Sequence, residues 1–217
     1  MSEVIFRRDL LTGAQSDAID QLAQIGDAFK LYGGAALVGV FGHRETRDLD
    51  FFSRNEFDPD ALLSSSSFIK GGTVLQKERN TLTVRTGNGL HVSFFGGIDI
   101  EPAAPYLQVT ERIFSASPLD IGATKLNTIL GRSKVEDYID LAEIELRGPG
   151  IEACLQATSK VWGPSFSKSE SLRALAYLED PHLAKLPEAH KSTIRAAVQR
   201  IMGRDQAVPR GDRGFER

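Results

Sequence analysis

The first part of the chain alternates helical and extended patterns. Apolar residues recur at helical spacing from 16 to 29, which predicts an amphipathic helix. Short apolar runs bounded by glycine, proline and serine then predict smaller elements. In order, we expect a strand at 30–32, a buried helix at 35–41, a strand at 48–52, a small helix at 57–63 and a serine loop at 64–67.

The pattern changes to period two between residues 68 and 95. Alternating apolar and polar side chains predict strands at 73–75, 81–85 and 90–95. Short turns containing glycine or asparagine separate them, and strands joined by short turns pair antiparallel. The first half of the chain is therefore predicted to hold helices and a mixed or antiparallel sheet.

The chain becomes helical after about residue 115. Ser117, Ser133 and Ser167 are each followed three residues later by an acid, which is the pattern of a helix-capping box. Pro181 and Pro187 suit the first turns of two further helices, the last running over 188–202 and stopping at Gly203. We expect an α/β core at 1–115, a helical region at 116–204 that completes the site, and a flexible tail at 205–217.

Composition narrows the class of protein only a little. One cysteine in 217 residues excludes an internal disulfide and fits a reducing compartment. The chain shows neither a signal-peptide pattern nor an apolar run long enough for a membrane span, so we expect a cytoplasmic protein without a membrane partner. A net charge of −3 gives no global sign of a nucleic-acid surface and leaves room for a local basic patch.

Candidate chemistry begins with a pair of carboxylates, Asp48 and Asp50. Alternate side chains of a strand share a face, so both point the same way while Leu49 and Phe51 point into the core. Their Cα atoms would lie about 6–7 Å apart, close enough for both to bind one Mg²⁺. The alternative is a pair of solvated strand carboxylates. A second pair, at 58 and 60, flanks a proline and is better explained as a helix cap.

A Gly33-Gly34 turn precedes this pair. It could be a simple bend, or it could present the amides of a helix N-terminus to a triphosphate. Neither a P-loop nor a dinucleotide-binding glycine pattern is present. Arg44 and Arg47 lie between the turn and the carboxylates and are further candidates for nucleotide binding.

A second group of charged residues lies between 117 and 140. Lys125 and Arg132 share a helix face if the helix reaches residue 132, and Asp137 and Asp140 share a face of the next helix. A surface ion-pair network is one interpretation. The other gives Lys125 the triphosphate and makes Asp137 a base or a group that orients the acceptor.

Together these segments resemble the nucleotidyltransferase toxin family of AbiEii/AbiGii type, also called MenT-like. The resemblance rests on GGAAL at 33–37, GHR at 42–44, DLDFF at 48–52 and KLNTILGRSKVEDYIDL at 125–141. It implies a polymerase-β-like nucleotidyltransferase core followed by a helical region, and so an α+β protein.

The resemblance also implies an activity. A family member of this kind transfers a nucleoside monophosphate from an NTP with Mg²⁺, known relatives modify tRNA 3′ ends, and they are toxins neutralised by an antitoxin protein. By resemblance Asp48 and Asp50 bind the metal, Lys125 contacts the nucleotide and Asp137 is required for activity. We expect the nucleotide also to meet Gly33, Gly34, Arg44, Arg47 and Arg132.

One position departs from many enzymes of this fold, which place a third carboxylate on a neighbouring strand. The centre of the candidate strand is Ser93, and serine cannot replace a carboxylate at Mg²⁺. Asp137 or Asp99 could complete the site, or metal binding is weakened. Two other functions therefore stay open: a non-catalytic module that binds a nucleotide, RNA or a partner protein, and kinase-like phosphoryl transfer to a partner protein.

Overall fold

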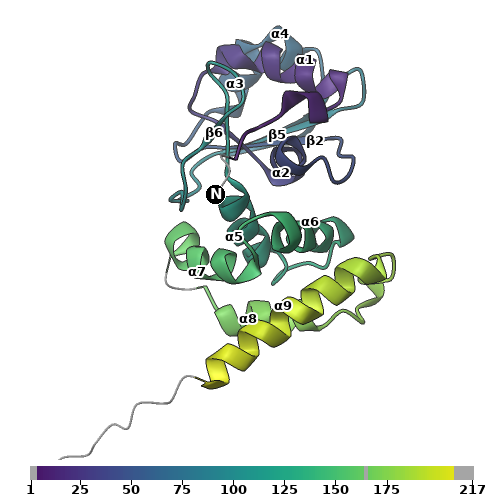
Figure 1. The fold of residues 1–217 in the computed structure, drawn as a ribbon. Coiled ribbons are helices and arrows are strands. Elements are labelled where there is room, and N and C mark those ends of the chain that lie inside the picture. The colour runs from purple at the N-terminus through teal and green to yellow at the C-terminus, as the bar shows by residue number, and fades with distance from the viewer. Residues whose placement is uncertain (1–3, 164–165, 208–217) are drawn as a thin grey trace, which may run out of the picture.

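The computed structural model describes residues 4–163 and 166–207, with side chains as far as Arg204. It is an α+β fold, in which a mixed seven-stranded sheet is followed by a helical C-terminal region (Figure 1). No helix within the described residues has the length and apolarity needed to cross a membrane.

The sheet is built from strands that are mostly short, and its order is β3-β4-β5-β2-β1-β7-β6. Pairing is antiparallel except between β2 and β5 and between β1 and β7, which are parallel. The strands are β1 (Lys30–Tyr32), β2 (Asp48–Phe52), β3 (Thr73–Glu78), β4 (Thr81–Arg85), β5 (His91–Phe95), β6 (Leu107–Gln108) and β7 (Phe114–Ser115).

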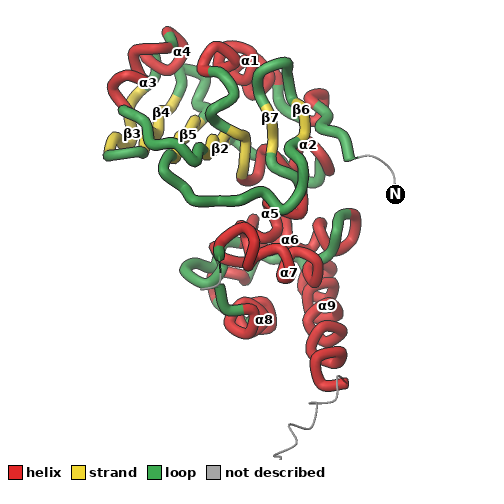
Figure 2. The backbone as a smooth tube through the Cα atoms, turned by 90° about the vertical axis from the view of Figure 1, so that its left-hand side faces the viewer, coloured by secondary structure: helices red, strands yellow, loops and turns green. Residues whose placement is uncertain are grey.

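Helices cover both faces of this sheet. On one side lie α1 (Gly13–Leu22), α3 (Pro59–Ser65) and α4 (Ser67–Lys70); α2 (Gly33–Phe41) and α5 (Pro118–Thr128) lie on the other (Figures 1 and 2). Short 3₁₀ turns occupy Arg8–Leu10, Ala23–Ile25 and Pro181–Leu183. The buried aromatic residues Phe51 and Phe94 stack at 5.4 Å between ring centres in the sheet part of the core.

The helical region packs beneath the α5 side of the sheet. It comprises α5, α6 (Val135–Arg147), α7 (Ile151–Trp162), α8 (Lys168–Ala176) and α9 (Glu188–Ala207). Gly122 of α5 allows close approach of α7, because a Cβ at that position would collide with the Cys154 Sγ. In Figure 2 the long α9 projects away from the sheet.

Several predicted elements are confirmed, while others are wrong at their ends. The strands at 30–32, 48–52 and 81–85 match the structure, as do the antiparallel pairings along β3, β4 and β5. The first helix starts earlier, because Thr12 and Gln15 form a capping box, and α1 ends at Leu22 rather than Phe29. The predicted serine loop is also wrong, since Ser64 and Ser65 end α3 and Ser67 begins α4.

The capping predictions divide in the same way. The hydroxyls of Ser117 and Ser167 accept hydrogen bonds from the amides of the acids three residues on, as expected. Ser133 does not cap a helix, because α6 begins one residue later than expected and the Ser133 hydroxyl donates to Asp180 instead. Asp58 accepts from the Asp60 amide at the start of α3, which confirms the helix-cap interpretation of the second Asp pair.

The C-terminal prediction is corrected. Pro181 opens only a 3₁₀ turn, and α9 does not stop at Gly203 but continues to Ala207. The predicted flexible tail therefore begins inside a helix, and its part after residue 207 lies outside the described residues. The division at residues 115 and 116 stays a prediction.

Candidate functional site

The predicted carboxylate pair lies on β2 in the expected orientation. Leu49 and Phe51 are fully buried, whereas Asp48 is exposed and Asp50 is partly buried on the opposite face. The strand pairs in parallel register with β5, which places Asp48 opposite His91 and Asp50 opposite Ser93. The Asp48 Oδ1 lies 3.4 Å from the His91 Nδ1.

The glycine turn lies directly against this pair. Gly33 opens α2 with a φ of +67°, a conformation that favours glycine, and a Cβ there would collide with the Asp50 carboxylate. A Cβ at Gly34 would collide with the Arg44 guanidinium. No side chain caps the N-terminus of α2, so its first amides have no side-chain acceptor at that end.

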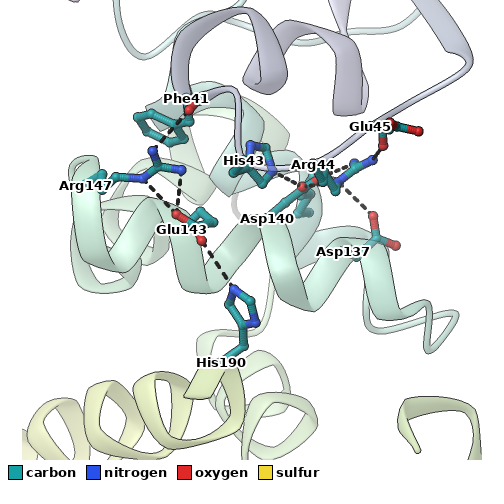
Figure 3. Close-up of polar contacts among 10 residues, drawn as sticks. Phe41, His43, Arg44, Glu45, Asp137, Asp140, Glu143, Arg147 and His190 are labelled. Carbon is teal, nitrogen blue, oxygen red and sulfur yellow. Dashed lines mark hydrogen bonds and ion pairs between the residues drawn. The ribbon is translucent and has the colours of Figure 1, made fainter. Parts of the chain in front are cut away.

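Asp140 of α6 is fully buried and contacts three side chains, those of Arg44, His43 and Lys125. Its carboxylate accepts two hydrogen bonds from Arg44, at 2.7 and 2.8 Å, and one from the His43 Nε2, at 2.6 Å (Figure 3). The Lys125 Nζ lies 2.7 Å from the Asp140 Oδ2. Because His43 and Arg44 follow α2 in the chain, these contacts join α6 to the glycine-turn helix.

Lys125 also binds Asp137, which lies one helical turn before Asp140. The Lys125 Nζ is 2.8 Å from the Asp137 Oδ1, and the Arg132 Nε is 3.2 Å from the Asp137 Oδ2. The helix α5 ends at Thr128, so Arg132 reaches Asp137 from the connecting loop, not from the helix face that the sequence suggested.

Burial and nearby charges shift the pKa values of Asp50 and Asp140 in opposite directions. Burial, and then the charge of Asp48, raises the pKa of Asp50 to about 6, and three nearby cations limit this rise. Burial alone would also raise the pKa of Asp140, but the Arg44 hydrogen bond and the Lys125 charge outweigh it and hold that pKa well below its usual range.

The cationic partners stay charged. Burial would lower the pKa of Lys125, yet the charges of Asp140 and Asp137 more than compensate and raise it above its ordinary value. The same balance raises the pKa of Arg44, where burial is outweighed by the Asp140 hydrogen bond. Lys125 and Arg44 therefore stay positively charged, whereas Asp50 takes up a proton more readily than an ordinary aspartate.

All the predicted site residues line one cavity of about 490 Å³, which we call the main cavity. Its lining comprises Gly33, Gly34, Arg44, Glu45, Thr46, Arg47, Asp48, Asp50, Lys125, Arg132, Lys134, Glu136 and Asp137. An adjoining inner cavity of about 320 Å³ shares the Asp pair, Lys125 and Asp137 and extends to Phe52 and Phe95. Two distant segments of the sequence, residues 33–50 and residues 125–137, thus meet in one place.

The donors fit a magnesium ion that takes few ligands from the protein. The ion commonly binds one or two carboxylates and completes its shell with substrate phosphates and water. Asp48 and Asp50 supply two carboxylates on one face, and Asp50 has no cationic hydrogen-bond partner that would compete with a metal. No cluster of three or more metal-ligating side chains occurs in the described part of the chain.

The strand β5, which pairs with β2, does not supply a third carboxylate beside the Asp pair. Ser93 lies at the centre of β5, as expected, and the strand register places it opposite Asp50, where its hydroxyl accepts a hydrogen bond from Thr83. Asp99 does not complete the site; it is almost fully exposed and pairs with Arg54 away from the main cavity. Asp137 lines the cavity, but its two oxygens bind Lys125 and Arg132.

Three contributions were not predicted from the sequence. Lys134 lines both cavities, and Asp140 and His43 form the buried support beneath them. Arg44 was expected to meet the nucleotide, yet its guanidinium is bound to Asp140 and to the Glu45 carbonyl. A signal for Asp140 was present in the sequence, since it follows Asp137 by three residues and so shares its helix face.

Comparison with known proteins places the fold. No family model matches the chain. The uncharacterized protein aq_aa25 of Aquifex aeolicus (strain VF5) is 32% identical over 136 residues, which is 58% of this chain and 63% of that protein.

Two solved structures from Helicobacter pylori are similar over most of their length. A "putative nucleotidyltransferase" aligns with a TM-score of 0.50 and 17% identity over 90% of this chain and 98% of its own. JHP933 aligns with a TM-score of 0.49 and 16% identity over 90% of this chain and 97% of its own. The first likeness supports a nucleotidyltransferase-like fold.

Proposed function

We propose that this protein is a Mg²⁺-dependent nucleotidyltransferase that moves a nucleoside monophosphate from an NTP to the 3′ end of a tRNA, as the toxin of a toxin–antitoxin pair. The observation that carries the transfer reaction is the main cavity, where the strand carboxylates Asp48 and Asp50 face the buried Lys125. The tRNA, the antitoxin and the cytoplasmic setting rest on the motif resemblance and the composition alone.

The metal would be held by Asp48 and Asp50. When bound, Mg²⁺ would neutralise part of the triphosphate charge and favour departure of pyrophosphate. Burial, and then the charge of Asp48, raises the pKa of Asp50, and a bound cation would offset both effects, which supports this assignment.

The chain's own cations and amides would position the triphosphate. The uncapped N-terminus of α2 offers backbone amides to an anion, and Lys125, Arg132 and Lys134 line the same cavity. In the reaction, an acceptor hydroxyl oxygen forms a bond to the α-phosphorus as the bond to pyrophosphate breaks, and the hydroxyl passes its proton to water. Lys125, kept protonated by Asp137 and Asp140, would stabilise negative charge that develops on the phosphates.

A second candidate function is a catalytically impaired module that binds nucleotide, RNA or a partner protein. The observation in its favour is Ser93, which occupies the position next to Asp50 where a third carboxylate would have to stand. Kinase-like phosphoryl transfer to a partner protein has no structural observation of its own and enters only as an outcome of the test.

The test is transfer of label from each α-labelled NTP to purified tRNA, with Mg²⁺. We expect the parent protein to label RNA and Asp50→Asn to lose at least about a hundredfold in rate, because it removes a metal ligand. A matched control is Asp60→Asn, which removes one acid of the second Asp pair on the surface and leaves the main cavity unchanged.

The outcomes separate the candidates. Label in RNA with the parent and Asp60→Asn, but not with Asp50→Asn, supports nucleotidyl transfer. Nucleotide binding by calorimetry without label transfer for any NTP or tRNA pool would establish the binding module instead. Transfer of label to protein in a parallel incubation with γ-labelled NTP would point to the kinase-like reaction.

A further inference from the structure

A second pocket of about 430 Å³, which we call the lateral pocket, lies where β1 begins and β2 ends. None of the predicted site residues lines it. Its lining comprises Asp27, Ala28, Lys30, Tyr32, Phe52, Ser53, Arg54, Asn55, Ile98, Ile100, Pro102 and Tyr106.

The lateral pocket lies next to the inner cavity, and the two share the side chain of Phe52. Lys30 pairs with Phe52 and Tyr32 pairs with Asp50 across the antiparallel strands β1 and β2, so all four share one face of the sheet. Phe52 lines both the lateral pocket and the inner cavity beside the Asp pair. It lies two residues beyond Asp50, a span of about 6–7 Å along the strand.

The lining combines aromatic rings with cations. Tyr32 stacks on Phe52 with 4.7 Å between ring centres and 12° between planes. The Lys30 ammonium lies 5.4 Å from the centre of the Tyr106 ring, and its hydrogen bond to the Asp27 carbonyl uses one of its three donors. Arg54 is largely exposed and pairs with Asp99 through one terminal nitrogen, which leaves other donors for a ligand.

A buried hydroxyl in this pocket lacks a partner. Tyr32 is 2% exposed, and its hydroxyl has no hydrogen-bond partner among the described residues. Leaving such a group unpaired costs about 1–3 kcal/mol. The hydroxyl is closed off from solvent, so Tyr32 contributes its ring, stacked on Phe52, to the lateral pocket.

We propose that the lateral pocket is the acceptor subsite, which binds one nucleotide of a single-stranded RNA with its base against the aromatic rings and its phosphate at Lys30 and Arg54. Aromatic platforms beside cations are the features that bind single strands, because every base has a stacking face and every linkage has a charge. This inference rests on the proposed function for its direction, since the strand would then run from the lateral pocket toward Asp50.

The first test measures RNA binding without NTP, so that it does not depend on catalysis. The probe is a short fluorescein-labelled single-stranded RNA ending in CCA, and the readout is fluorescence anisotropy over a range of salt. We expect Arg54→Ala to weaken binding about tenfold and to reduce the slope of log affinity against log salt by about 0.7. The matched control is Asp99→Ala, which breaks the same ion pair but keeps Arg54, and should bind as the parent or more tightly.

The aromatic side is tested in the same assay. Tyr106→Ala should weaken binding about tenfold through loss of stacking, whereas Tyr106→Phe, which keeps the ring, should not.

The possible results decide the matter separately from the proposed function. Equal weakening by Arg54→Ala and Asp99→Ala, or no RNA binding by the parent, overturns the subsite. Weaker binding of NTP alone by Arg54→Ala, with RNA binding unchanged, also overturns it and assigns the pocket to a free nucleotide. Normal label transfer with an unchanged acceptor KM in Arg54→Ala rejects the subsite and leaves nucleotidyl transfer standing. If the parent shows no transfer activity but binds RNA in a way that depends on Arg54, the subsite stands and nucleotidyl transfer is rejected.

Discussion

Asp50 is the residue at which stability and function conflict. It is partly buried beside Asp48, faces the closed turn at Gly33, and has its pKa raised to about 6. A folded-state pKa above the unfolded value means that the metal-free folded protein binds this proton more tightly than the unfolded chain. Ionised Asp50 therefore destabilises the metal-free fold, fully above about pH 6 and not at all below about pH 4.

The residue-scale prediction is that Asp50→Asn stabilises the metal-free protein at pH 7. We expect a gain of about 1–3 kcal/mol in the free energy of unfolding, measured by urea denaturation in EDTA. The gain should vanish near pH 4, where Asp50 of the folded parent is protonated and so is neutral like the asparagine of the variant. Addition of Mg²⁺ should stabilise the parent and leave Asp50→Asn unchanged, whereas a loss of stability in the variant at pH 7 would contradict the assignment.

Single residues also show why the site was only partly predictable. The orientation of Asp48 and Asp50 follows from strand alternation, which is a local rule. The importance of Asp140 does not, because a charged residue on a helix face is usually solvated. Its burial depends on His43 and Arg44, which lie almost a hundred residues away in the sequence.

At the scale of elements, helix ends account for most of the differences between expectation and structure. A glycine near the end of an apolar pattern usually stops a helix, yet α9 passes through Gly203 to Ala207. The sequence gives no sign that Gly122, inside a helix, has a packing role, yet the absence of a side chain there lets α5 approach α7 closely.

The element-scale prediction contrasts these two glycines. A Cβ at Gly203 would meet no atom within 4 Å, so Gly203→Ala should raise the free energy of unfolding by about 0.5–1 kcal/mol through helix propensity. Gly122→Ala should lower it by about 1–3 kcal/mol, because the added methyl overlaps the Cys154 side chain. Both are measured by urea denaturation. If Gly203 instead ended the helix in a left-handed conformation, its substitution would be destabilising.

At the scale of the whole molecule, Asp140 ties the sheet part to the helical region. From α6 it binds the His43-Arg44 segment after α2 and Lys125 of α5. A second set of contacts continues outward along α6: Glu143 binds Arg147, which donates to the Phe41 carbonyl, and His190 at the start of α9 (Figure 3). The parts that supply the two halves of the site are thus held together by α6.

The prediction for the whole molecule is that Asp140→Asn loses about 3–5 kcal/mol at pH 7, because Arg44 loses its buried partner and Lys125 keeps only Asp137. The depressed pKa of Asp140 makes this contribution present above the unfolded value near 4 and lost as the pH falls through the folded value. The difference between parent and variant in urea denaturation should therefore shrink below about pH 4.

A matched control is Asp20→Asn, whose exposed pair with Arg8 should be worth less than about 1 kcal/mol. A similar loss in both variants would show that Asp140 has no special role. A variant too unstable to purify can be replaced by the parent alone, followed by hydrogen exchange in α6 between pH 6 and pH 3, where an unchanged opening free energy would count against the prediction.

The sequence by itself determined the local features of this protein: the strands with their alternating faces, the glycine turn, the carboxylate pair, and the charged residues of the following helices. These follow from periodicity and backbone geometry over a few residues. Only the tertiary structure decided that they share one cavity, that Ser93 stands beside Asp50, that Asp140 supports Lys125 and Arg44, and that a lateral pocket opens beyond Phe52. Those outcomes depend on parallel pairing and helix packing between distant segments, and no local pattern specifies which distant partners meet.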